Sequence, residues 1–181
     1  MMYAEDLLSN NPKDEFVTSN LWTGDSSTIN GGAIKFDLDW VVSGWDSNTC
    51  DLWEEVQSTD FFWNRVTMKK AMLMGAKFAK TMGDSESSTT YTSTAAAIDA
   101  KLDTHWTGTF VAEESNRQKD GAVLVGFNNG YDSEDDRYSP VSVEVSGIKT
   151  LSVLSRNPMD GAGDSLRKCS SLSTSTSFLT P

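Results

Sequence analysis

One group of acidic residues around a tryptophan could carry acid–base chemistry. The group consists of Trp53 with the carboxylates Asp46, Asp51, Glu54 and Glu55. Carboxylates this close resist simultaneous ionisation, and an apolar neighbour disfavours the charged form. Such a site can keep one carboxylic acid protonated near neutral pH, so that it can protonate a leaving oxygen such as that of a glycoside. The same residues also fit a solvated acidic loop before a helix N-terminus, and composition alone favours that interpretation.

Amphipathic helices are predicted on both sides of this group. Apolar residues recur at helical spacing over 34–45, and a polar cluster over 46–49 ends that pattern. A longer apolar stripe over 61–79 predicts the clearest helix, for which 58–60 offer N-cap oxygens and Gly83 offers a C-terminal stop. A third helix is predicted over 95–102, after a Ser/Thr-rich loop over 83–94.

The rest of the chain is predicted to hold little regular structure. Residues 1–32 carry many turn formers and are expected to be loops with one short helical turn at most. Residues 141–148 fit either a strand or a helix, and local propensity alone favours a strand. A Ser/Thr-rich tail is expected to be disordered. Residues 113–137 are mostly charged or turn-forming. Their carboxylates are interpreted as solvated loop charges: Glu113, Glu114, Glu134, Asp135 and Asp136.

The charge balance excludes several classes of partner. The 181 residues include 26 acidic and 15 basic side chains, for a net charge of -11, which argues against binding to nucleic acid or to an anionic membrane surface. No apolar run approaches the ~18 residues of a membrane-spanning helix. No signal peptide is visible, so the compartment stays undetermined. No Cys/His spacing indicates a metal site and no Gly-rich loop indicates a phosphate site, so no cofactor is expected.

The cysteines and the single histidine have unremarkable interpretations. Cys50 and Cys169 could form a disulfide or remain two free thiols. As a catalytic nucleophile Cys50 would need a nearby base, so a buried thiol is the preferred interpretation. His105 is expected to cap a helix or pack in the core.

The string around the acidic group favours the catalytic interpretation. The chain reads Asp51-Leu52-Trp53-Glu54-Glu55-Val56, followed by Phe61-Phe62, and this resembles the catalytic-acid signature of glucoamylases, glycoside hydrolase family 15. Flanking segments resemble the same family in the same order, namely 37–45, 61–80, 106–108, 116–127 and 137–140. The six-residue motif is highly specific. The flanking matches are individually weak, but they occur in the family's order over about 34–150, and this order supports the resemblance.

The resemblance implies a role for each residue of the motif. Glu54 would be the general acid that protonates the glycosidic oxygen, and Glu55 would bind sugar hydroxyls beside it. Trp53 would line the cleft, the Leu52 carbonyl would accept a sugar hydroxyl, and Asp51 would shape the loop and favour protonation of Glu54. The family inverts configuration, so a second carboxylate about 6.5–9.5 Å from the acid would activate water.

The sequence departs from the family outside the motif. The family's base is a Glu in a Ser-x-x-Glu-Gln context, and no Glu-Gln pair occurs in this chain. The upstream Arg-Asp pair and the Trp-Gly-Arg-Pro segment are missing, and Cys50 stands where an aromatic residue is usual. Residues 156–160 resemble Arg-Tyr-Pro-x-Asp, which would place Arg156 against substrate with Asp160 orienting it; a polar linker is the alternative.

The helical patterns thus predict an all-α fold, and the resemblance implies that this fold is part of an (α/α)6 toroid. Its expected parts are a loop-rich segment 1–32, a catalytic-domain fragment 33–155 and a low-complexity tail 156–181. The resemblance implies a monomer that releases glucose from the non-reducing ends of starch or maltooligosaccharides. Because this chain holds the acid and lacks the base, the isolated chain is expected to be inactive. The alternative is a non-catalytic sugar-binding or interaction remnant of the same fold.

Overall fold

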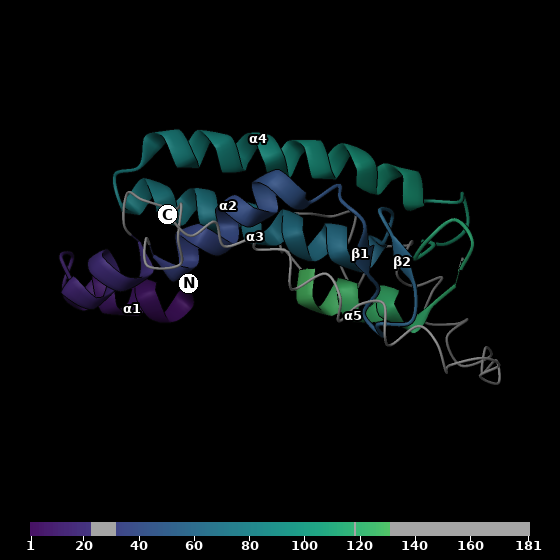
Figure 1. Ribbon diagram of the computed structural model, residues 1–181, viewed down its shortest axis with the longest axis horizontal. Helices are drawn as coiled ribbons and strands as arrows, with labels where there is room; N and C mark the ends of the chain where they lie inside the picture. Colours follow the sequence, from purple (N-terminus) through teal and green to yellow (C-terminus); the bar gives the residue numbers. More distant parts are fainter. Residues whose placement is uncertain (23–31, 118, 131–181) are drawn as a thin grey trace, which may run out of the picture.

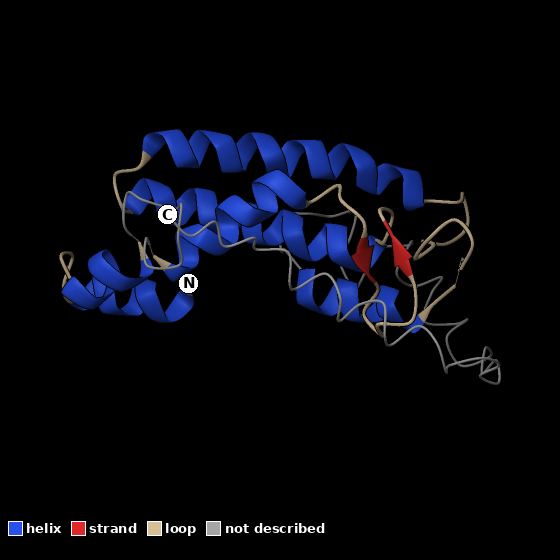
Figure 2. Cartoon of the chain, viewed as in Figure 1, coloured by secondary structure: helices blue, strands red, loops and turns tan. Residues whose placement is uncertain are grey.

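The computed structural model describes residues 1–22, 32–117 and 119–130, and helices dominate this part of the chain (Figures 1 and 2). None of the described helices is both long and apolar enough to cross a membrane. In chain order the elements are α1 (Met2–Asn10), η1 (Val17–Leu21, a π-helix), α2 (Ala33–Gly44), β1 (Thr49–Cys50), β2 (Gln57–Ser58), α3 (Phe62–Thr81), α4 (Ser85–Leu102), η3 (Asp103–His105) and α5 (Gly121–Gly130).

A long hairpin of α3 and α4 organises the described structure (Figure 1). One apolar core lies where α1, η1 and α2 pack against this hairpin, around Leu38, Met72 and Phe78. A second core lies at the other end of the hairpin, where α5 packs against α3. It consists of Phe62, Val66, Leu102, Val111, Val123 and Phe127. The acidic motif lies at this second end, between β1 and β2.

Helices α2 and α3 lie where the sequence predicts them, but the predicted cap of α3 is wrong. The residue before α3 is Phe61, whose side chain makes no capping hydrogen bond. The backbone amide of Phe62 donates instead to the Glu113 carbonyl at 2.8 Å. The predicted stop is confirmed, because Gly83 follows the end of α3 with φ of +78°, which glycine adopts without strain.

The predicted loop over 83–94 is wrong, because α4 begins at Ser85. Asp84 caps this helix by accepting a hydrogen bond from the Ser87 amide at 3.0 Å. The hydroxyls of Thr89 and Thr92 bond to the carbonyls four residues earlier, at 2.9 and 2.8 Å. These local bonds satisfy the polar side chains inside the helix. Burial of Tyr91 against the first core then outweighs the low helix propensity of the Ser/Thr-rich stretch.

The prediction of loops over residues 1–32 is also wrong. Helix α1 and η1 occupy much of that segment, and Leu8, Val17 and Trp22 are buried in the first core. The Trp22 ring meets the Phe78 ring edge-on at 5.3 Å between centroids. Turn formers such as Pro12 separate the two helical pieces but do not prevent them. Residues 121–130, likewise predicted without a helix, form α5.

A buried lysine joins α2 to the start of α4. The Lys35 ammonium donates to the Ser87 hydroxyl at 2.5 Å and lies 3.4 Å from Asp39 and 3.5 Å from Asp84. It also lies 5.5 Å from the centroid of the Trp22 ring, within cation–π range. Two carboxylates and a hydroxyl therefore compensate for the burial of this charge.

A glycine on α3 sets its distance from α2. A Cβ atom added at Gly75 would lie 2.8 Å from both methyl carbons of buried Leu38. We expect Gly75→Ala to lower the free energy of unfolding by about 1–3 kcal/mol, because the buried leucine must move. Urea denaturation measures this change. The matched control is Gly121→Ala in α5, where an added Cβ meets nothing within 4 Å; an equal loss in both variants would contradict the prediction.

Candidate active site

The acidic motif forms the turn of a short antiparallel hairpin. β1 and β2 pair Thr49 with Ser58 and Cys50 with Gln57. The Asp51 amide donates to the Val56 carbonyl at 3.0 Å, which closes the turn. Buried Asp51 also accepts hydrogen bonds through Oδ1 from the amides of Glu55 at 2.8 Å and Val56 at 3.2 Å. The Asp51 side chain therefore holds the backbone of the turn from inside.

Glu54 has an unusual backbone conformation. It is the one non-glycine residue with positive φ in the described part of the chain, at 57°. This left-handed conformation costs an L-residue roughly 1–2 kcal/mol. The hydrogen bonds from the amides of Glu55 and Val56 to Asp51 hold the turn in which this conformation occurs. Strained residues of this kind concentrate at functional sites, so Glu54 stands out from backbone geometry as well as from sequence.

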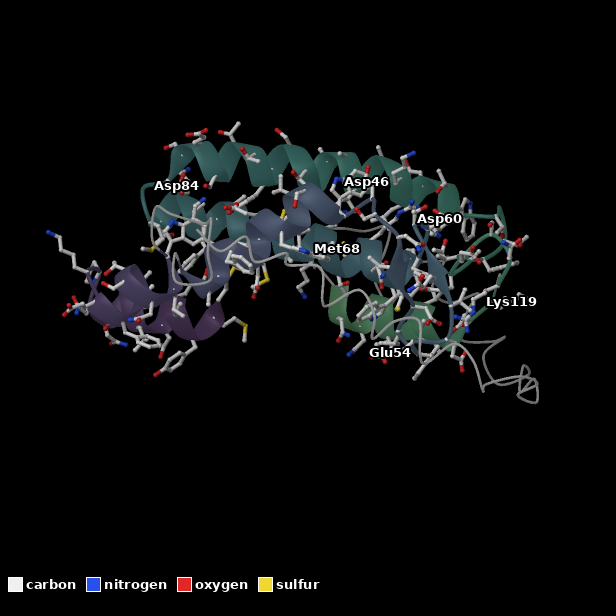
Figure 3. The ribbon with its side chains drawn as sticks, viewed as in Figure 1. Asp46, Glu54, Asp60, Met68, Asp84 and Lys119 are labelled. Atoms are coloured by element: carbon white, nitrogen blue, oxygen red, sulfur yellow. The ribbon has the colours of Figure 1, made fainter. Side chains whose placement is uncertain are left out.

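The side chains of the motif lie largely at the surface. Glu54 and Glu55 are exposed, Trp53 is 49% exposed, and Leu52 is half-buried. The predicted inclusion of Asp46 in this group is wrong: Asp46 is an exposed residue of the turn after α2, and Figure 3 shows it well away from Glu54. The described residues therefore do not enclose Glu54 in apolar surroundings, and its role as acid stays a prediction.

Arg117 joins two carboxylates of the motif. Its guanidinium contacts Asp51 through Nη1 and Glu55 through Nη2, the latter at 3.2 Å. Burial alone would lower the pKa of Arg117, but the hydrogen bond to Asp51 and the charges of Asp120, Asp51 and Glu55 raise it above its ordinary value. Arg117 therefore carries a permanent positive charge between these carboxylates.

Asp120 connects the same site to α5. Its Oδ2 lies 3.2 Å from Nη2 of Arg117, and its Oδ1 accepts a hydrogen bond from the Trp53 indole at 3.3 Å. Oδ1 also accepts from the Ala122 amide at 2.8 Å, in the first turn of α5. Arg117 and Asp120 lie in the segment that resembles Ser-Arg-x-x-Lys-Asp of the family. That resemblance and their i,i+3 spacing were the only signals for them, and sequence reasoning gave them no role.

The interpretation of Glu113 and Glu114 as solvated loop charges is wrong. Glu113 is 0% exposed and Glu114 is 8% exposed. The Glu113 carboxyl group accepts a hydrogen bond from the Trp63 amide at 3.3 Å, and Glu114 accepts one from the Ser58 hydroxyl at 3.3 Å. Glu113 therefore holds the start of α3, and Glu114 holds strand β2 at the end of the β-hairpin. Sequence could not show this, because the partners lie about fifty residues away.

Burial changes the proton affinity of Glu113. Desolvation raises its pKa from 4.5 to about 8, the amide of Trp63 opposes this, and the charge of Asp120 adds to it. Glu113 is therefore mostly protonated in the native state at pH 7. Because its side chain is fully buried, Glu113 has no access to solvent water, which the predicted base would have to activate.

His105 has the packing role predicted for it. It is buried, its Nδ1 pairs with the Ala112 carbonyl at 3.0 Å, and its Nε2 lies 2.8 Å from Arg65. Desolvation and the charge of Arg65 lower its pKa, although Asp60 opposes them. A neutral imidazole fits this setting. Cys50 is disulfide-bonded, so the preferred interpretation as a thiol is wrong.

Several predicted features lie outside the described residues. They are Arg156 and Asp160, the carboxylates 134–136, the helix-or-strand segment 141–148, Cys169 and the low-complexity tail. The residues that the structure does describe contain no group of three or more His, Cys, Asp or Glu arranged to hold a metal ion.

Comparison with known proteins agrees with the resemblance of the motif. The family model described as glycosyl hydrolases family 15 matches residues 16–156. Glucoamylase 1 of Rhizopus oryzae is 42% identical over 96 residues, which are 51% of this chain and 15% of that protein. The glucoamylase of Blastobotrys adeninivorans is 32% identical over 138 residues, which are 71% of this chain and 22% of that protein. The chain thus spans less than a quarter of either relative's length.

A solved structure of a glucoamylase also matches this chain. The glucoamylase of Saccharomycopsis fibuligera superposes with a TM-score of 0.63 at 25% sequence identity, covering 84% of this chain and 34% of that one. The predicted all-α fold, as part of an (α/α)6 toroid, is confirmed by this match and by the helical structure. Since the family model covers well over half of its residues, the chain belongs to glycosyl hydrolase family 15.

Proposed function

We propose that this chain supplies the general acid of a glucoamylase-type hydrolase that releases glucose from the non-reducing ends of α-1,4-glucans. The observation that carries the proposal is the left-handed backbone of Glu54 in the middle of the family's acid motif. Asp51 holds the turn beneath it, and the Glu54 carboxyl is accessible to a substrate. Relatives named glucoamylase support the substrate class of starch and maltooligosaccharides.

The neighbours of Glu54 would bind the sugar. Exposed Trp53 would pack its ring against the apolar face of a sugar, and Glu55 would accept hydrogen bonds from hydroxyl groups as a carboxylate held by Arg117. The Leu52 carbonyl would accept another hydroxyl, and Arg156 would contact substrate from downstream. Glu54 would then protonate the glycosidic oxygen while a water molecule attacks from the opposite face.

The base of this inverting reaction has no candidate in the described residues. No Glu-Gln pair occurs in the sequence, and Glu113 and Glu114 are buried in structural contacts. We therefore expect the 181-residue chain by itself to release no more glucose from maltotetraose than its Glu54→Gln variant does. A coupled glucose assay measures this. Robust turnover by the unaltered chain would show that a base is present after all.

The lack of a candidate base among the described residues favours a second function, a sugar-binding or interaction remnant of the same fold. Titration of the ¹⁵N-labelled chain with maltotetraose, followed by amide chemical shifts, tests the sugar specificity that the hydrolase proposal requires. We expect shifts at residues 52–55 at millimolar sugar and none with cellotetraose, the β-linked control. Equal responses to the two sugars would exclude a site for α-1,4-glucans. Glu54→Gln should not alter binding in either case, so its effect on turnover, measured in a longer form of the protein that shows turnover, separates enzyme from remnant.

A further inference from the structure

We propose that Arg117 and Asp120 are positioning residues that fix the direction of Glu54 by holding the side chains on both sides of it. We call this pair the Arg117–Asp120 clasp. The proposal rests on the proposed function for the role of Glu54 as general acid. The contacts of the clasp do not depend on that role.

Alternate side chains of the motif turn are held by the clasp. Arg117 contacts Asp51 and Glu55, and Asp120 receives the indole N–H of Trp53. The three contacts cross separations of 66, 62 and 67 residues along the chain. Both immediate neighbours of Glu54 are thus fastened to one downstream segment. Holding both neighbours restricts the backbone of the left-handed residue between them, and with it the direction in which the Cα–Cβ bond of Glu54 points.

Burial makes this clasp stronger than an ordinary surface ion pair. The side chain of Arg117 is 21% exposed, that of Asp51 is 0% exposed and that of Asp120 is 13% exposed. Exposed ion pairs contribute little because water competes for them, whereas a desolvated guanidinium that bonds to two carboxylates is held in a fixed geometry. The side chain of Glu55, at 46% exposed, is the end of the clasp that a substrate could reach.

The clasp also connects the turn to a rigid part of the fold. Asp120 accepts the Ala122 amide in the first turn of α5, and Val123 and Phe127 of α5 are buried in the second core against α3. The turn itself is joined to α3 through the short strand β2. The motif is therefore held from two directions by elements that share one core. Loss of the clasp should loosen the turn while that core remains folded.

Hydrogen exchange at individual amides tests the clasp. The amides of Glu55 and Val56 donate to Asp51, so their protection reports the order of the turn. In Arg117→Gln we expect exchange at both amides to accelerate about tenfold or more relative to the unaltered chain. Arg117→Lys should recover part of the protection, because lysine keeps the positive charge but cannot bond to two carboxylates with the planar donor geometry of a guanidinium. The Ile98 amide in α4 should be unchanged in both variants.

The matched control removes a charge from the same segment. Lys119→Gln changes a residue two positions from Arg117. The Lys119 ammonium lies 4.8 Å from the centroid of the Phe110 ring, which is outside the motif, and Lys119 is exposed (labelled in Figure 3). We expect its exchange pattern to match the unaltered chain. If Arg117→Gln does not fold, Arg117→Lys and Asp120→Asn carry the test. The proposal is overturned if the turn amides accelerate no more than Ile98, or if Lys119→Gln accelerates them equally.

Maltotetraose titration of the same variants separates this proposal from the proposed function. Faster exchange at the turn in Arg117→Gln, with no maltotetraose binding even to the unaltered chain, supports the clasp and contradicts the proposed substrate. Maltotetraose binding that is equally tight in both proteins, together with unchanged exchange at the turn, overturns the clasp and leaves the substrate supported.

Discussion

Glu54→Gln is expected to lower glucose release from maltotetraose about 10²–10⁴-fold in any natural form of this protein that shows turnover. Glutamine keeps the size and hydrogen-bonding reach of the side chain but has no proton to give to the departing sugar. The dissociation constant for maltotetraose should therefore change little. Initial rates of glucose release, compared with binding by calorimetry, measure the two effects separately.

The leaving group provides an internal check on this prediction. An α-glucosyl fluoride releases a weakly basic anion, so it needs less help from a general acid than a maltooligosaccharide does. Glu54→Gln should therefore be less impaired on the fluoride. Glu86→Gln removes an exposed carboxylate in the first turn of α4 and should have no effect on either substrate. Equal impairment of Glu54→Gln on both substrates would assign Glu54 to binding rather than to proton transfer.

The elements that could be predicted are those whose signal is local. Helices α2 and α3 have apolar residues at helical spacing, and both lie where that spacing places them. The acid motif is a contiguous string, so it was found without any knowledge of the fold. Helix α1 and the first half of α4 were missed because their stability comes from packing: Leu8 and Tyr91 are buried in the first core, within polar sequences that would form loops alone.

The supporting residues of the site could not be predicted, because their function depends on distant partners. Arg117 and Asp120 meet the motif across more than sixty residues, and their sequence context is an ordinary charged loop. Glu113 has the same context, yet it is fully buried beneath the start of α3. Charge alone suggested solvation for Glu113, and sequence reasoning assigned no role to Arg117 or Asp120. These residues precede α5, and the packing of α5 on α3 brings them against the turn between β1 and β2.

Stability of the fold is expected to fall as pH rises from about 4.5 to about 8, because of Glu113. Its pKa is raised in the native state, chiefly by burial, so the folded chain holds a proton that the unfolded chain releases above pH 4.5. Between the two pKa values the native state binds more protons, and stability decreases with pH. The contribution that favours folding is complete below pH 4.5 and is lost as pH passes 8. The full change is about 5 kcal/mol, of which about 3 is lost by pH 7.

Glu113→Gln should remove this dependence and leave the fold more stable at neutral pH. The glutamine side chain can still accept a hydrogen bond from the Trp63 amide, and it does not have to take up a proton when the chain folds. Urea unfolding of both proteins across pH 4.5–8.5 gives the difference in free energy, in which the other carboxylates cancel. We expect the difference to be small at pH 4.5 and to reach about 3 kcal/mol in favour of the variant at pH 7. Glu15→Gln controls for net charge at an exposed site. A difference that stays constant with pH would mean that Glu113 is ionised in the fold and that the positive end of α3 compensates for its burial.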